Sequence, residues 1–228
     1  MCLRFEQFGL DQAEFAAAVA ATFPAIVLKD DYQLSPNIAL TEPANIVFHQ
    51  SFLRLQHARF GLVPAWKKVP DATLGNARSD TVDKLPSFAD LFLTRRCLVP
   101  ATAFYEWHLD PGEKRKTPYR ITTDDQVFYL AGLWDYWVPQ ELVSFTILTT
   151  DPNPLISQLH NRMPVILEKS AYDKWLDPGN LDIHELKTFL KPYPADQMSY
   201  QAYDRYVSSA GNKDQGQIVP SGEVVRLA

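Results

Sequence analysis

The sequence predicts an α+β fold, a single mostly-β domain over residues 1–228 with many short strands and a few peripheral helices. Three observations indicate this class. Short β-branched or alternating runs recur along the chain, helical patterns are few, and 17 prolines suit a loop-rich architecture with defined turns. The 228 residues, 46% of them hydrophobic, suffice for one large core or two closely packed halves.

The first half of the chain begins with a predicted helix. Asp11 starts it, Glu14 completes a capping box, and an Ala-rich run continues to Phe23. Between residues 32 and 66, short runs broken by prolines predict strands. The stretch from Ser87 to Asp90 indicates the start of a second helix, which is expected to end near residues 95–96.

Predicted strands dominate the second half of the chain. They cover residues 97–107, 119–122, 127–134 and 144–149. Helical patterns return at 170–176 and 183–190. A closing strand is expected over 200–207, and a C-terminal tail follows it.

Charge and cysteine content limit the possible functions. The net charge of −5 argues against non-specific coating of duplex DNA, which needs many Lys and Arg contacts to phosphates, but it is compatible with a local basic groove. Two cysteines make no disulfide framework, and Cys97 is interpreted as a buried free thiol. The N-terminus lacks the apolar core of a signal peptide, and no apolar stretch has the length of a membrane span. We therefore expect a cytoplasmic protein with no membrane partner.

Cys2 is the most informative residue. Removal of Met1, which the small neighbouring side chain permits, leaves an N-terminal cysteine with its α-amine and thiol on adjacent carbons. Such a 1,2-aminothiol condenses with an aldehyde to an imine and then to a thiazolidine ring. The α-amine has a pKa of about 7.7–8, against about 10.4 for lysine, so a useful fraction is free base at neutral pH. Carbonyl capture or acyl transfer is the chemistry indicated, and the alternative is an incidental cysteine.

Three charged side chains are candidates for the same chemistry. Arg4, two residues after Cys2, would share its face on a strand. Arg78 ends the Gly- and Asn-marked loop 75–79. Glu106 stands between two aromatic residues. It lies either on the exposed face of an alternating strand or partly buried, with a raised pKa suited to proton transfer.

Other candidates lie further along the chain. His160 is either a general acid/base or a structural residue, and Arg162 would share its face in an extended segment, which suits a phosphate-bearing substrate. Trp66 either stacks on a base or packs in the core. The chain has no CxxC pair and no HExxH, GxGxxG, GxxxxGK[ST] or GxSxG motif, so we expect no metal and no cofactor.

Six short motifs, taken together, resemble a known family. They are Met1-Cys2-x-Arg4, Gly61-Leu62-Val63-Pro64-x-Trp66, Asn76-Ala77-Arg78, Arg96-Cys97-Leu98-Val99-Pro100, Phe104-Tyr105-Glu106-Trp107 and His160-x-Arg162-Met163-Pro164. In this order, and up to about residue 207, the chain is similar to the SRAP-domain family of SOS-response-associated peptidases, which includes abasic-site processing proteins. The resemblance implies a barrel-like core and single-stranded DNA containing abasic sites as the partner of a monomeric protein.

The resemblance also implies catalytic roles. In this family the N-terminal cysteine is attached covalently to the ring-opened sugar aldehyde of an abasic site, a role that falls to Cys2. Asn76 would orient the N-terminal group or the opened sugar. Glu106 would assist proton transfers beside the amine, and His160 would help to open the sugar hemiacetal.

DNA contacts follow from the same resemblance. Arg78 and Arg162 would hold the phosphates that flank the lesion, Arg4 would add a contact, and Trp66 would prop the unstacked strand apart. With Arg95 and Arg96, these arginines would form a local groove that offsets the negative net charge and places the protein on the nucleoid.

Some residues depart from the family pattern. Leu3 stands where glycine is common, Phe60 where tryptophan is common, and Ser79 and Asp80 where the stretch more often reads Ala/Ser-Glu. Two other functions stay open. One is a thiol peptidase or amidohydrolase whose α-amine serves as the base, with autocatalytic removal of Met1. The other is a non-catalytic single-strand-binding module. Lyase activity at the lesion would accompany an imine that does not close to the ring.

Overall fold

The strands of the protein form two sheets. A computed structural model describes residues 2–28, 33–70 and 74–227, so the start of the strand-rich region predicted at residue 32 lies outside the described residues. The six-stranded sheet has the order β14-β13-β9-β8-β1-β3, with antiparallel pairing throughout. Its strands are β1 (Arg4–Gln7), β3 (Ser35–Ala39), β8 (Ala103–His108), β9 (Thr117–Thr123), β13 (Met198–Tyr203) and β14 (Pro220–Val225).

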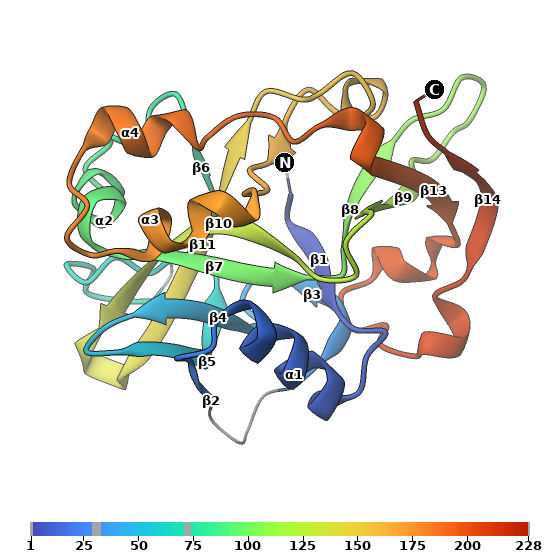
Figure 1. The fold of residues 1–228 in the computed structure, drawn as a ribbon. Coiled ribbons are helices and arrows are strands. Elements are labelled where there is room, and N and C mark those ends of the chain that lie inside the picture. Colours follow the sequence, from blue (N-terminus) through green and yellow to red (C-terminus); the bar gives the residue numbers. More distant parts are fainter. Residues whose placement is uncertain (1, 29–32, 71–73, 228) are drawn as a thin grey trace.

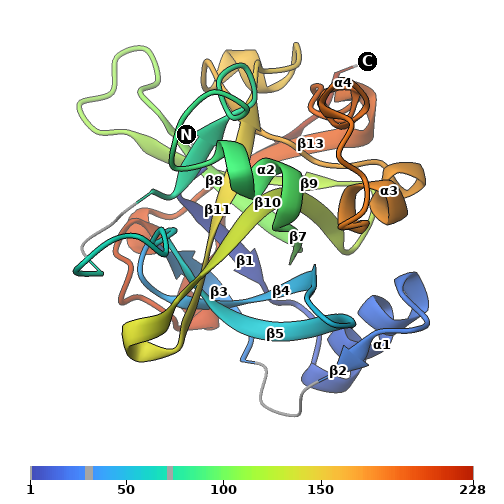
Figure 2. The same cartoon turned by 90° about the vertical axis from the view of Figure 1, so that its left-hand side faces the viewer.

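The eight-stranded sheet closes on itself. Its strands are β2 (Val27–Leu28), β4 (Pro43–His49), β5 (Leu53–Phe60), β6 (Asn76–Arg78), β7 (Arg96–Ala101), β10 (Phe128–Trp137), β11 (Leu142–Thr150) and β12 (Met163–Pro164). Strands β11, β10, β7, β4 and β5 pair in that order, and parallel pairing of β5 with β11, Phe60 opposite Phe145, completes a five-stranded barrel. The predicted mostly-β fold with a barrel-like core is therefore confirmed (Figures 1 and 2).

Short helices lie outside the sheets (Figure 1). They are α1 (Gln12–Thr22), α2 (Ala89–Thr94), α3 (Tyr172–Leu176) and α4 (Ile183–Thr188). The predicted capping box is confirmed, because Glu14 N–H donates to Asp11 Oδ1 at 2.8 Å and Asp11 N–H donates to Glu14 Oε2 at 2.9 Å. The second predicted helix is also confirmed, and its start falls inside the stretch 87–90 that the sequence indicated. Helix α2 begins after Phe88, which makes no side-chain cap.

Two sequence predictions differ from the structure in the strand regions. The expected strand 97–107 breaks at Thr102 into β7 and β8, which belong to different sheets. Its apolar pattern continues across the break, where Thr102 N–H instead donates to Glu6 O at 3.0 Å. The closing strand ends at Tyr203, and the expected tail contains β14, which pairs with β13.

Aromatic packing fixes the N-terminal strand against the barrel. The Phe5 ring packs on Phe60 and Phe145 at centroid distances of 5.4 and 6.5 Å, and all three side chains are fully buried. Burial of each such ring stabilises the fold by roughly 1.5–3 kcal/mol. Strand β1 is thereby held between β3 and β8, with Phe5 opposite Phe104. Cys2, two residues before this strand, lies in the core.

Two further expectations concern single features. Cys97 is a buried free thiol, as predicted. Within the described residues, no helix is long and apolar enough to cross a membrane.

Candidate active site

Cys2 lies in the core two residues before β1. Its side chain is fully buried, and its carbonyl oxygen accepts a hydrogen bond of 3.0 Å from Asn76 Nδ2. Burial raises the pKa of the Cys2 thiol far above its ordinary value, and the Glu106 carboxylate raises this pKa further. The thiol is therefore neutral in this state and needs a base before it can act as a nucleophile.

Asn76 is positioned by the pairing of β6 with β11. It lies opposite Ile147, and its Nδ2 also donates to Gly75 O at 2.9 Å. Its Oδ1 is buried and has no hydrogen-bond partner among the described residues. A Cβ at Gly75 would come within 2.6 Å of Leu40 Cδ2 and 2.7 Å of Leu3 Cδ2, so both leucine side chains would have to shift. The Leu3 side chain thus packs on the loop that presents Asn76.

Glu106 approaches Cys2 from β8. The antiparallel register of β1 and β8, continued past Phe5 and Phe104, brings residue 106 beside residue 3. The Glu106 side chain is only 4% exposed, and burial raises its pKa above the ordinary value. Of the two sequence interpretations, the buried carboxylate with a raised pKa is confirmed.

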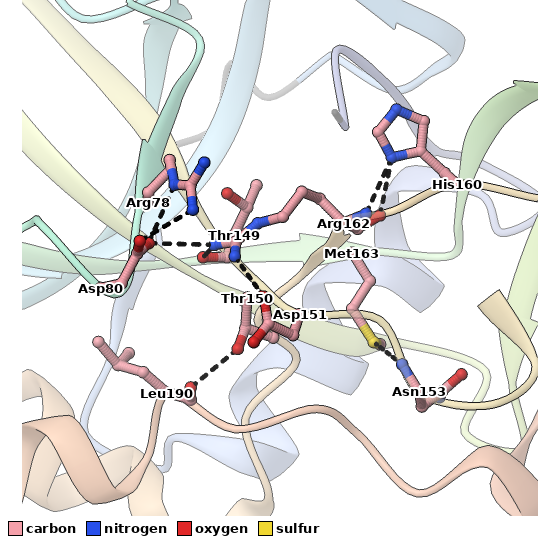
Figure 3. Close-up of polar contacts among 10 residues, drawn as sticks. All are labelled: Arg78, Asp80, Thr149, Thr150, Asp151, Asn153, His160, Arg162, Met163 and Leu190. Carbon is pink, nitrogen blue, oxygen red and sulfur yellow. Dashed lines mark hydrogen bonds and ion pairs between the residues drawn. The ribbon is translucent and has the colours of Figure 1, made fainter. Parts of the chain in front are cut away.

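His160 is a neutral imidazole in a defined orientation. The backbone of Arg162 holds the ring: its N–H lies 3.0 Å and its carbonyl oxygen 3.2 Å from His160 Nδ1 (Figure 3). Burial lowers the pKa of His160. His108 Nδ1 lies 3.1 Å from Leu159 O and thereby ties the end of β8, which carries Glu106, to the residue before His160.

Arg78 and Arg162 are brought together across β11, whose Thr149 lies opposite Arg78 on β6 and opposite Pro164 on β12. A chain of ion pairs joins them (Figure 3). The exposed Arg78 guanidinium binds Asp80 at 2.9 Å. The buried Arg162 guanidinium lies 3.6 Å from Asp80, and it also binds Asp151 at 2.6 Å and Thr149 O at 2.6 Å.

Asp80 and Asp151, the two carboxylates in this series of ion pairs, have no role predicted from the sequence. In the sequence, Asp80 stands out only as a departure from the family pattern. Asp80 lies two residues after the end of β6 and Asp151 one residue after the end of β11, but a local pattern cannot show which cations they contact. Together they offset the charges of Arg78 and Arg162.

Arg4 and Trp66 differ in their accessibility. Arg4 Nη1 donates to Asn37 Oδ1 at 2.8 Å and to Val207 O at 2.9 Å, and its guanidinium stacks over Trp107 at 5.3 Å. Trp66 is 64% exposed, so the interpretation of Trp66 as a core residue is wrong. It lines a cavity of about 240 Å³ beside α2.

The groove expected from Arg95 and Arg96 does not form as predicted. Arg96 is buried and donates to Phe92 O at 2.8 Å and to Trp175 O at 2.6 Å, so its assignment to a surface groove is wrong. Arg95 pairs with Asp135. Within the described parts of the chain, no group of three or more His, Cys, Asp or Glu side chains is placed to hold a metal ion.

A family model described as SOS response associated peptidase (SRAP) matches residues 1–210. The chain belongs to the SRAP family. The chain is 37% identical to the Bacillus subtilis abasic site processing protein YoqW, over 91% of this chain and 89% of that protein. It is also 31% identical to the abasic site processing protein HMCES of Pongo abelii, over 74% of this chain and 57% of that protein.

Solved structures of bacterial proteins share the fold of this chain. A crystal structure of a protein from Bacteroides thetaiotaomicron superposes with a TM-score of 0.78 at 26% identity, covering 93% of this chain and 97% of that one. A second, from Bordetella bronchiseptica, gives a TM-score of 0.74 at 25% identity over 89% of this chain and all of that one. The predicted removal of Met1 concerns a residue outside the described part of the chain.

Proposed function

We propose that this SRAP protein binds single-stranded DNA and captures abasic sites covalently through Cys2 after removal of Met1. The observation that carries the proposal is the burial of Cys2 between Asn76, which binds its carbonyl, and Glu106, whose pKa is raised. The names of the bacterial and vertebrate relatives support the same substrate.

The chemistry uses the two groups of an N-terminal cysteine. The α-amine adds to the ring-opened sugar aldehyde, and loss of one water gives an imine. The Cys2 sulfur then adds to the imine carbon, its proton leaves to Glu106, and the ring nitrogen gains a proton, which closes a thiazolidine. The thiazolidine ring has no iminium, so it does not promote the β-elimination that would break the DNA strand. The lesion is therefore shielded.

The remaining site residues serve binding and proton transfer. His160 helps to open the sugar hemiacetal, and Asn76 orients the opened sugar through its buried Oδ1. Arg78 and Arg162 hold the phosphates beside the lesion, and Arg4 adds positive charge. Trp66, an exposed aromatic residue, stacks on an unpaired base.

A thiol peptidase is the alternative, and the state of Cys2 argues against it. Thiol peptidases use a cysteine whose surroundings lower the pKa of the thiol, so that it is present as the thiolate. Burial instead raises the pKa of the Cys2 thiol. Peptide hydrolysis without DNA would favour that alternative.

The test is incubation with single-stranded DNA that carries one abasic site, followed by denaturing electrophoresis and intact mass. We expect an adduct with the mass of the DNA plus the protein without Met1, less one water. It should be absent for Cys2→Ala and for undamaged DNA, and Cys2→Ser should give a slower, less stable adduct or strand cleavage. Native protein with a confirmed N-terminal cysteine and no adduct would refute the proposal. A normal, stable yield from Cys2→Ser would refute the thiazolidine.

A further inference from the structure

The positive charge expected at the site is largely neutralised. Arg78 pairs with Asp80 and Arg162 with Asp151, while Arg96 is buried in the core. The protein as a whole has a net charge of −5. Capture of a polyanion at this site therefore needs cations that are not already paired with carboxylates.

Such cations lie at the tip of the β8–β9 hairpin. Lys114, Arg115 and Lys116, here called the basic tip, are consecutive and exposed. Within the described residues, none of the three side chains forms an ion pair. The acidic residues of the same loop are occupied, because Glu113 pairs with Arg205 at 3.1 Å and Asp110 accepts a hydrogen bond of 2.7 Å from Tyr119.

The basic tip is held beside the candidate active site. The register of the hairpin pairs Glu106 with Tyr119 and His108 with Thr117, so Lys116, one residue before Thr117, adjoins the last pair of the ladder that carries Glu106. The Arg205 guanidinium donates to the backbone carbonyls of Arg115 and Lys116, both at 3.3 Å, and so orders the loop.

The other strand of the hairpin, β8, ends at His108, which contacts the residue before His160. The contact of His108 with Leu159 O, at 3.1 Å, fixes the base of the hairpin against the segment that carries His160. Both ribbon views place the hairpin tip at the same end of the molecule as the N-terminus and the segment before β12 (Figures 1 and 2).

We propose that the basic tip is a phosphate-binding element for the single strand that runs out of the lesion site. It supplies the unpaired positive charge that Arg78 and Arg162 lack, and it reads charge without reading sequence. This inference rests on the proposed function for the identity of the strand.

Salt dependence measures such contacts directly. Each phosphate contact on a single strand contributes about 0.7 to the slope of log affinity against log salt, so three contacts contribute about 2. Between about 50 and 200 mM salt, the native protein should then lose about 20-fold more affinity than a variant without the tip charges.

The experiment is fluorescence anisotropy with a labelled single strand that carries a tetrahydrofuran abasic analogue, which cannot form an aldehyde. The test variant is the triple change Lys114→Gln, Arg115→Gln and Lys116→Gln. The control makes the same change in net charge with Lys169→Gln, Lys174→Gln and Lys191→Gln, around α3 and α4 on the other side of the molecule (Figure 1).

We expect the slope to fall by about 2 in the tip variant and to keep its native value in the control variant. A native slope in the tip variant overturns the inference, as does an equal fall in both variants, which would show a net-charge effect alone. Because this strand has no aldehyde, the result is independent of covalent capture. Failure of the native protein to form an adduct with a true abasic site would refute the proposed function and leave the salt slopes standing.

Discussion

Asn37 offers a test of how the C-terminal segment positions the N-terminus. Its fully buried side chain accepts a hydrogen bond from Arg4 Nη1 at 2.8 Å. Its Nδ2 donates to three backbone carbonyl oxygens, those of Val207 at 3.2 Å, Ser209 at 2.9 Å and Asn212 at 2.9 Å. One side chain therefore joins β3, the residue two positions after Cys2, and the segment after β13.

The cost of Asn37→Ala follows from these contacts. The two N–H donors contribute about 1 kcal/mol each, and the charge-assisted bond from Arg4 contributes about 2 kcal/mol. We expect the free energy of unfolding to fall by about 4 kcal/mol, which is a shift of about 1.3 M in the urea midpoint for a slope near 3 kcal/mol/M. Loss of the Arg4 anchor should also slow adduct formation at saturating DNA by about 10–100-fold.

Ser208→Ala is the matched control within the same segment. It removes only the hydrogen bond of 2.9 Å from Trp107 Nε1 to an exposed hydroxyl, and should cost less than about 1 kcal/mol. Urea unfolding followed by tryptophan fluorescence measures both variants. A loss below about 1 kcal/mol for Asn37→Ala, or a loss equal to that of Ser208→Ala, would refute the reasoning.

Three further predictions address single residues. Because burial raises the pKa of Glu106, the folded state binds more protons than the unfolded state between the ordinary and raised values, and stability falls as pH rises through that window. Glu106→Gln should thus be more stable than the native protein at pH 7, with the difference vanishing below about pH 4, and should form adducts about 100-fold more slowly. Equal urea midpoints at pH 7 would contradict the burial argument. Thr41 is a β-branched residue at φ 73°, a strained backbone conformation that Thr41→Gly should relieve. We expect this change to raise Tm by about 2–4 °C in calorimetry, and a lower Tm would show that the backbone is not strained there. Trp66→Ala should leave the urea midpoint nearly unchanged but weaken single-strand binding by about 5–100-fold in anisotropy, whereas a loss of stability with unchanged binding would indicate a packing role.

Local signals predicted the elements whose causes are local. The capping box at Asp11 and Glu14 depends on residues three apart, and the structure shows both of its hydrogen bonds. The buried carboxylate of Glu106 was one of two outcomes that alternation allows, since its aromatic neighbours do not reveal which face of β8 is covered. The break at Thr102 was missed because apolar residues continue on both sides of it.

Long-range pairing explains what the sequence left undecided at the site. Arg78 and Arg162 lie close together only because β11 pairs with both β6 and β12. The sequences of β6 and β12 do not indicate which strand each will pair with. Long-range pairing also brings Asp80 and Asp151 to these arginines, whereas the sequence alone indicates two solvent-exposed carboxylates. Arg96 reads as a surface cation, yet it is buried because backbone carbonyls at the ends of α2 and α3 receive its donors.

The bond from Arg4 to Val207 O has a consequence for biosynthesis. It joins the first strand to a residue 203 positions later, so the N-terminus leaves the ribosome long before its anchor exists. At about 5–20 residues per second, the nascent chain exposes its second residue for roughly 10–40 s before that anchor has been made. An enzyme that trims the N-terminus therefore meets an open chain, because the contact that anchors β1 forms only after residue 207 has been synthesised.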